Sequence, residues 1–194
     1  MPVNEFMNNV DSCVTYYIDK ENRLTFVDDK WYEFALDNKA AQLTRPVVVN
    51  KSLFSFISDE STIHLYKMLI ERIRKEQETL GFAFRCDSPD RRRFMEMVLF
   101  PLSNNSVGFR SCIIKEELRK TVALLDAGGV RSGDLLKICS WCKKIELDHS
   151  VWVEVEQAVE SLGLFNVVKL PYLTHGMCPS CHDGYIQELF KNDV

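Results

Sequence analysis

The 194-residue sequence lacks both long apolar runs and an excess of basic charge. No stretch approaches the roughly 18 apolar residues that a membrane-spanning helix needs. The first residues show neither the basic start nor the apolar segment of a secretory signal, so we expect a cytoplasmic protein without a membrane partner. Lys and Arg number 24 against 28 Asp and Glu, a net charge of -4. Because proteins that neutralise phosphates usually carry excess base, we expect no nucleic-acid partner either.

Signatures of common enzyme classes are also missing. The chain contains no G-x-S-x-G elbow, no Ser-His-Asp order of a hydrolase and no phosphate-binding loop. Gly128-Gly129 is not followed by the Lys-Ser/Thr of such a loop. We therefore expect that the protein is not an enzyme.

The seven cysteines divide into two populations. Cys13, Cys86 and Cys112 are scattered among apolar neighbours, and we expect them to be small buried side chains, since free cysteine is among the most buried residue types. The other four form two identical spacings, Cys139-Ser-Trp-Cys142 and Cys178-Pro-Ser-Cys181. Such a spacing lets both sulfurs of a tight turn point to one side. Two such turns facing each other make a tetrahedral metal site.

The spacing therefore predicts a structural Zn²⁺ site. Its predicted ligands are Cys139, Cys142, Cys178 and Cys181. Iron in the same geometry and a dithiol redox pair stay open as alternatives, although a redox pair needs only one of the two motifs. Residues 178–182 also match the attachment signature of c-type haem. We interpret them as metal ligands instead, because both cysteines already have partners, and we interpret His175 and His182 as neighbours of the site or surface groups.

The 35 residues between Cys142 and Cys178 exceed the commonest gap between such motifs. An inserted helix explains the excess. We expect it to begin after an N-cap at Ser150 and to end at Gly163. Its apolar face would carry Trp152, Val155, Val159 and Leu162.

The first 117 residues predict an α+β domain. Alternating apolar residues indicate five strands, and helical spacing indicates two short helices followed by a long one. The expected strands are 14–18, 23–27, 80–86, 93–101 and 106–115, and the helices lie near 31–35, at 52–57 and from the Asp59 cap to Lys75. This order permits a five-stranded antiparallel sheet with helices on one face.

The same order resembles a PAS domain. Residues 17–31 resemble its opening hairpin and first helix, and residues 52–57 resemble its turn before the long helix. The resemblance covers about residues 10–117 and implies a sensory or interaction module that holds a small ligand, or none, and often dimerises. Together with the two cysteine motifs, it resembles a group of bacterial PAS-like proteins with a C-terminal cysteine module.

A cofactor of the PAS-like domain is not indicated. His64 falls opposite the apolar face of the long helix, so we expect it to be exposed rather than to bind haem. No cysteine sits where a light-sensing flavin domain needs one. Large strand residues such as Phe82, Met97 and Phe109 are expected to fill the core. We therefore expect an empty or small pocket, and the identity of any ligand is unknown. The charged turn from Asp87 to Arg93 is interpreted as a solvated hairpin loop rather than a partner contact.

A linker is predicted between the two parts. Leu118, Val122 and Leu125 have helical spacing, and residues 127–133 form a glycine-rich break. We thus expect a PAS-like domain at 10–117, a linker helix and flexible break at 118–136, and a zinc-ribbon-like α/β module at 137–194. Aromatic residues of the module are expected to build its small core, namely Trp141, Trp152, Phe165 and Tyr172.

These observations predict a non-enzymatic regulatory module. The PAS-like domain would bind a ligand or a signalling protein, alone or as a homodimer, and the zinc site would stabilise or present an interaction surface. One alternative is a thiol-based redox sensor in which oxidation releases the metal. Another is an iron-binding electron carrier.

Overall fold

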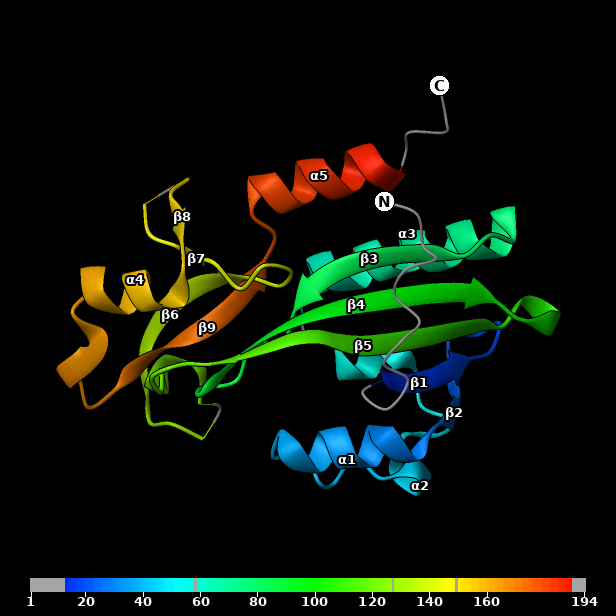
Figure 1. Cartoon of the computed structure of the whole chain (residues 1–194), viewed down its shortest axis with the longest axis horizontal. Helices are drawn as coiled ribbons and strands as arrows, with labels where there is room; N and C mark the ends of the chain where they lie inside the picture. Colours follow the sequence, from blue (N-terminus) through cyan, green and yellow to red (C-terminus); the bar gives the residue numbers. More distant parts are fainter. Residues whose placement is uncertain (1–12, 58, 127, 149, 190–194) are drawn as a thin grey trace. The chain divides into compact units, whose positions relative to one another are not determined.

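The computed structural model describes residues 13–57, 59–126, 128–148 and 150–189 (Figure 1). The chain divides into two compact units. The first unit contains the chain up to Phe84 and Arg93–Glu116, and the second contains Arg85–Arg92 and the chain from Glu117 onward. The second unit therefore includes the segment expected to be a linker, together with a turn from the PAS-like region.

The first unit contains the expected five-stranded antiparallel sheet. Its strand order is β2-β1-β5-β4-β3, and β1 pairs antiparallel with both β2 and β5. The strands are β1 (Cys13–Ile18), β2 (Leu24–Val27), β3 (Leu80–Arg85), β4 (Arg91–Pro101) and β5 (Val107–Leu118). The helical elements are α1 (Asp29–Asp37), α2 (Arg45–Val48), η3 (Leu53–Phe56), α3 (Glu60–Glu76) and the turn η4 (Ser103–Asn105). The predicted order of elements is confirmed.

Local side-chain chemistry explains where the helices of this unit begin. The Asp28 carboxylate accepts the Trp31 amide at 3.0 Å and caps α1, while its second oxygen accepts the Thr15 amide at 2.6 Å. One residue therefore fixes both the start of the helix and its attachment to β1. Asp59 caps α3 through the Thr62 amide at 2.8 Å, as the sequence predicted.

Aromatic side chains fill the space between the sheet and α3. Phe109 on β5 is fully buried and stacks on Tyr16 at 4.7 Å and on Tyr66 of α3 at 6.2 Å between ring centroids. Figure 1 shows α3 lying alongside the sheet. Leu69 of α3 is buried whereas His64 is exposed, which confirms the predicted orientation of this helix.

Two of the three scattered cysteines are not isolated buried thiols. Cys13 and Cys112 face each other across β1 and β5 and form a disulfide. They are 99 residues apart in the chain, so only the pairing of these strands brings them together. Cys86 is not part of a disulfide and is half-buried. The expectation of three buried single cysteines was therefore wrong.

The second unit is built on a four-stranded sheet of order β8-β7-β6-β9. The pair β6–β9 is parallel, and the pairs β6–β7 and β7–β8 are antiparallel. Its strands are β6 (Arg131–Cys139), β7 (Ile145–Glu146), β8 (Trp152–Val153) and β9 (Leu170–Gly176). Its helical elements are η5 (Ala123–Leu125), α4 (Val155–Ser161), η6 (Leu164–Asn166) and α5 (Pro179–Leu189).

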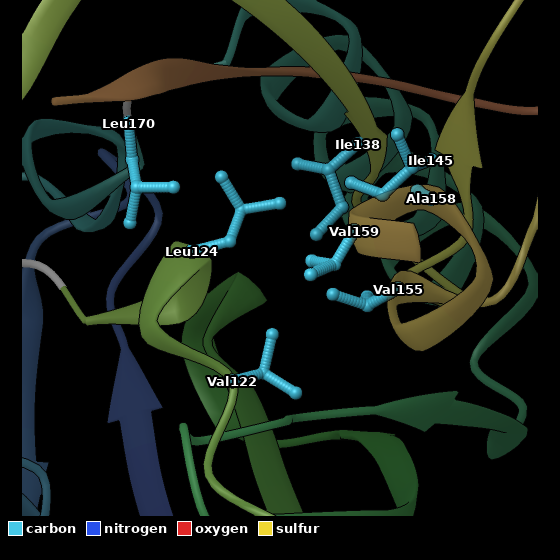
Figure 2. Packing of buried hydrophobic residues seen from close by; sticks show 8 residues of the cluster. All are labelled: Val122, Leu124, Ile138, Ile145, Val155, Ala158, Val159 and Leu170. Carbon is cyan, nitrogen blue, oxygen red and sulfur yellow. The ribbon is translucent and has the colours of Figure 1, made fainter. Parts of the chain in front are cut away.

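The core of the second unit lies between η5, α4 and the sheet. Figure 2 shows its eight buried side chains gathered from these elements. They are Val122, Leu124, Ile138, Ile145, Val155, Ala158, Val159 and Leu170. Arg131 closes one side, because its guanidinium donates to the Leu124 carbonyl at 3.1 Å and to the Pro171 carbonyl at 3.0 Å.

The predicted linker helix is wrong. Strand β5 continues to Leu118, and the following residues form only the short turn η5. Leu118 is 79% exposed, whereas Val122 and Leu124 are buried. Of the three residues of the predicted stripe, Val122 is in the core of the second unit and Leu125 packs against it, but Leu118 is not buried, so the spacing does not mark one face of a helix.

The helix between the cysteine motifs exists but is shorter than predicted. It begins after Glu154, which forms a capping box with Gln157, and not after Ser150. Trp152 lies before the helix and joins strand β8. Gly163 follows the helix with a φ of 65°, as expected for a terminating glycine.

The aromatic residues of the second unit are not all in its core. Trp141 is buried, but Phe165 is 63% exposed and Tyr172 is 54% exposed. The predicted aromatic core is therefore wrong for these two residues.

Among the described residues, the helices do not combine the length and apolar character that crossing a bilayer requires.

Candidate metal centre

Parallel pairing of β6 and β9 brings the two cysteine motifs together. Cys139 ends β6 and is the register partner of Gly176, which ends β9. The Ser140 amide donates to the Gly176 carbonyl at 2.8 Å, so both turns leave the same end of the sheet. Parallel strands need a long crossover connection, usually with a helix. The strands β7 and β8 and helix α4 fill this connection, which explains the long gap between the motifs.

The four predicted cysteine side chains lie close together. The sulfur atoms of Cys139, Cys142, Cys178 and Cys181 are all within 4.8 Å of one another. The Cys142 and Cys178 sulfurs are 3.6 Å apart. A tetrahedron with metal–sulfur bonds of about 2.3 Å has edges of about 3.8 Å between sulfurs. The cluster therefore has the donor type and the dimensions to hold one metal ion.

The backbone shapes each turn around the sulfurs. After Cys142, Lys143 adopts a left-handed conformation with a φ of 60°, and its amide donates to the Cys139 carbonyl at 3.1 Å. The Cys178 amide donates to the Cys139 sulfur at 3.4 Å. Cys178 directly precedes α5 and Cys181 lies in its first turn. Amide groups directed at a sulfur favour its thiolate form, which is the form that binds metal.

Proximity of the thiols also redistributes their charge. Hydrogen bonds from the Cys142 and Cys181 thiols, together with backbone amides, lower the pKa of Cys139 far below its ordinary value. The Cys139 sulfur in turn raises the pKa of Cys142 to about 12, and it raises the pKa of Cys181 as well. Without a cation, negative charge is thus concentrated on the buried Cys139. A bound cation allows several thiolates to coexist, because its charge offsets their mutual repulsion.

The two nearby histidines do not join the cluster. His182 is exposed, and its Nδ1 lies 3.2 Å from the Asp183 carboxylate. His175 lies on β9 with an exposed side chain. Within the described part of the chain, the grouped donor atoms are the four cysteine sulfurs.

The turn expected to be solvated is instead packed beside this centre. Asp87 has a side chain only 1% exposed and pairs with Arg85 at 2.5 Å and with Arg119 at 3.2 Å. Arg119 also contacts Glu156 of α4 at 3.2 Å. The prediction of a solvated turn was wrong for Asp87 and Arg93, which are buried, whereas Asp90 and Arg91 are exposed as expected. Its charged composition gave no sign of burial, because the partners at 119 and 156 are distant in the sequence.

A hollow in the first unit lies beside α1. Its volume is about 310 Å³. It is lined by Val27, Asp28, Asp29, Trp31, Tyr32, Glu33 and Arg45. The lining comes from residues that precede or begin α1 and from Arg45, which begins α2. Trp31 also lies edge-on to Tyr16, with 5.6 Å between ring centroids, so one lining residue of the hollow contacts the aromatic stack of Tyr16, Tyr66 and Phe109.

Comparison with known proteins finds similarity among solved structures. No protein family matches the sequence, and no curated protein matches it significantly. Among solved structures, the PAS domain from Bordetella pertussis BvgS is similar, with a TM-score of 0.42 and 16% sequence identity. The match covers 53% of this chain and 76% of that chain.

Proposed function

We propose that the protein is a non-enzymatic regulatory module with a structural zinc site. Cys139, Cys142, Cys178 and Cys181 would bind the ion, which would hold the ends of β6 and β9 and the start of α5 together. The grouping of four sulfurs within 4.8 Å carries this proposal. Four cysteine ligands leave no open position on a tetrahedral ion, which is typical of structural rather than catalytic zinc.

The first unit would supply the regulatory part. Its five-stranded antiparallel sheet and its opening hairpin support a PAS-like sensory or interaction domain. We propose that it acts in the cytoplasm on a signalling protein, alone or as a homodimer. The second unit would then be a small zinc-ribbon-like module that presents an interaction surface.

Metal analysis of the purified full-length chain tests the zinc site. We expect a colourless protein with one zinc ion per chain. Replacement by Co²⁺ should produce the visible bands of tetrahedral thiolate coordination. Cys139→Ser should lower metal content and loosen the second unit, whereas Ser180→Ala is the matched control because Ser180 lies between two of the predicted ligands with an exposed side chain and is not in the cluster. Equal metal content in Cys139→Ser and the wild type would contradict the proposal, and visible iron–thiolate bands in the protein as purified would favour an electron carrier.

A redox sensor is a second candidate, favoured by the distance between two cluster sulfurs. Cys142 and Cys178 lie 3.6 Å apart, and Cys142 is partly exposed. In this reaction hydrogen peroxide accepts two electrons from the two thiolates and two protons from solvent, which yields a disulfide and two waters and releases the ion. Mild peroxide should then release zinc, and a dithiol reductant should permit rebinding. If zinc stays bound under peroxide, the redox sensor is contradicted and the structural role of the site remains.

A further inference from the structure

The turn between β3 and β4 is part of the second unit, although both strands belong to the sheet of the first. The Val122 amide donates to the Pro89 carbonyl at 2.9 Å, and the Arg119 amide donates to the Asp90 carbonyl at 2.9 Å. The Arg119 guanidinium also donates to the Ser88 carbonyl at 2.6 Å. Three bonds to consecutive carbonyls thus hold the turn Arg85–Arg92 against the segment that leads into η5.

The same turn reaches the metal centre through Arg85. The Arg85 amide donates to the carbonyl of Trp141 at 2.8 Å, and Trp141 lies between the ligands Cys139 and Cys142. This bond is a direct attachment of the β3–β4 turn to a metal-binding turn. It is formed inside the second unit, since both residues belong to it.

The Arg85 side chain is held in place from two sides. Its guanidinium pairs with Asp87 at 2.5 Å and with Glu154 at 2.7 Å, where Glu154 is the N-cap of α4. The Arg85 and Asp87 side chains are both buried. A planar guanidinium bound by two carboxylates has one favoured position, so the charge group fixes the backbone of Arg85 as well.

Further ion pairs also join the β3–β4 turn to helix α4. Arg92, at the other end of the turn, pairs with Glu156 at 3.0 Å, and Arg119 pairs with both Asp87 and Glu156. Helix α4 is therefore joined to the turn by several charge pairs, and it belongs to the crossover that sets β6 and β9 side by side. The turn is therefore attached both to the Cys139–Cys142 turn and to the crossover that leads to β9.

We propose that Arg85, held by Asp87 and Glu154, is a positioning residue for the metal centre. It fixes the Cys139–Cys142 turn, so that metal affinity depends on the position of the β3–β4 turn. The converse holds by thermodynamic reciprocity: metal binding stabilises that turn. The second unit would in this way link metal occupancy to two strands of the PAS-like sheet. The proposal rests on the metal site proposed above.

Metal affinity of charge-group variants tests this role. Zinc binding to the full chain is measured by competition with a chromophoric chelator, and the site is also loaded with Co²⁺ to record its visible spectrum. Arg85→Met should weaken zinc binding about 10- to 100-fold, the usual effect of losing a residue that orients metal ligands. It should also shift the Co²⁺ bands, and Arg85→Lys should restore part of the affinity. Arg91→Met is the matched control, because Arg91 lies in the same turn with an exposed side chain.

A milder variant keeps the test decisive if Arg85→Met does not fold. Glu154→Gln retains an oxygen for the helix cap but loses the charge that holds Arg85, and the exposed Glu160 of α4 supplies the control Glu160→Gln. Glu154→Gln should weaken zinc binding and Glu160→Gln should not. In the wild type, adding zinc should slow amide hydrogen exchange in residues 85–92.

The outcomes separate this inference from the proposed function. A wild-type chain that binds neither Zn²⁺ nor Co²⁺ overturns both. A wild type that binds metal, with unchanged affinity and Co²⁺ spectrum in Arg85→Met and Glu154→Gln, overturns only the positioning role. Exchange in residues 85–92 that does not respond to zinc overturns the coupling.

Discussion

Replacing Leu124 by alanine tests whether the segment after β5 belongs to the second unit. Leu124 is 1% exposed and packs with seven other buried residues of that unit. Leu→Ala substitutions in cores cost about 2–5 kcal/mol. Leu124 also lines a hollow of about 230 Å³, so its environment is less tightly enclosed than a solid core. We therefore expect a loss near the lower part of this range, about 3 kcal/mol.

Hydrogen exchange followed by mass spectrometry measures this effect segment by segment. A loss of about 3 kcal/mol corresponds to an increase of about 100-fold in the open population, because 1.4 kcal/mol is a factor of ten. Amides of β6, β7 and α4 should therefore exchange about 100-fold faster in Leu124→Ala when exchange proceeds through opening of the unit. Amides of β1 and α3 should keep their rates. Leu118→Ala is the control, because that side chain is exposed.

Two results would refute the reasoning behind this prediction. Unchanged exchange in the second unit would mean that Leu124 contributes no packing there. Faster exchange in β1 and α3 but not in β6 would mean that the segment packs on the first unit, as a linker helix docked on its five-stranded sheet would do.

Three further predictions address other features. Gly108→Ala places a methyl carbon 2.2 Å from the Phe100 ring, so urea unfolding should show a loss of about 1–3 kcal/mol, and a double-mutant cycle with Phe100→Ala should show coupling. When the chain is unfolded in the presence of a chelator and the absence of a reductant, an alkylating reagent should modify five cysteines, because Cys13 and Cys112 form a disulfide. Burial raises the pKa of Glu156, but its backbone hydrogen bond and the two arginines that pair with it outweigh burial and lower it. The Glu156 charge therefore contributes to stability above the ordinary pKa of glutamate, and this contribution is lost as pH falls through the lowered pKa. In Glu156→Gln, the free energy of urea unfolding should consequently decrease less on acidification than in the wild type.

Features that depend on neighbouring residues were predictable from the sequence. Asp59 caps α3 because its carboxylate reaches an amide three residues ahead. Gly163 follows α4 because a left-handed conformation is easy for glycine. The spacing of Cys139 and Cys142 likewise determines that their sulfurs share one turn. Each of these interactions spans at most a few residues, so it is visible as a short pattern.

Apolar spacing alone did not identify the type of element. Trp152 fits the helical face of residues that follow it, yet it lies in β8, because pairing with Glu146 of β7 outweighs local helix preference. Val122 also matched a helical stripe, although its burial comes from a turn inserted into a core. The spacing of apolar residues shows which side chains are to be buried, but the residues that bury them lie elsewhere in the chain.

The charged turn shows the same limit for polar residues. Asp87 is bounded by residues typical of a solvated loop, and burial of a carboxylate is rare unless it is paired. Its partners, Arg85 and Arg119, are placed by different elements. Neither their identity nor their approach follows from the composition of the turn.

The sequence by itself determined the two cysteine turns, the Asp59 cap of α3, the Gly163 end of α4 and the order of strands and helices in the first unit. Tertiary structure alone decided that β6 and β9 pair in parallel, that Cys13 faces Cys112, and that the β3–β4 turn attaches to the Cys139–Cys142 turn. The physical reason is the range of the forces involved. Caps and tight turns are stabilised by hydrogen bonds between near neighbours, whereas strand pairing and buried charge pairs gain their free energy from groups brought together only when the whole unit excludes water.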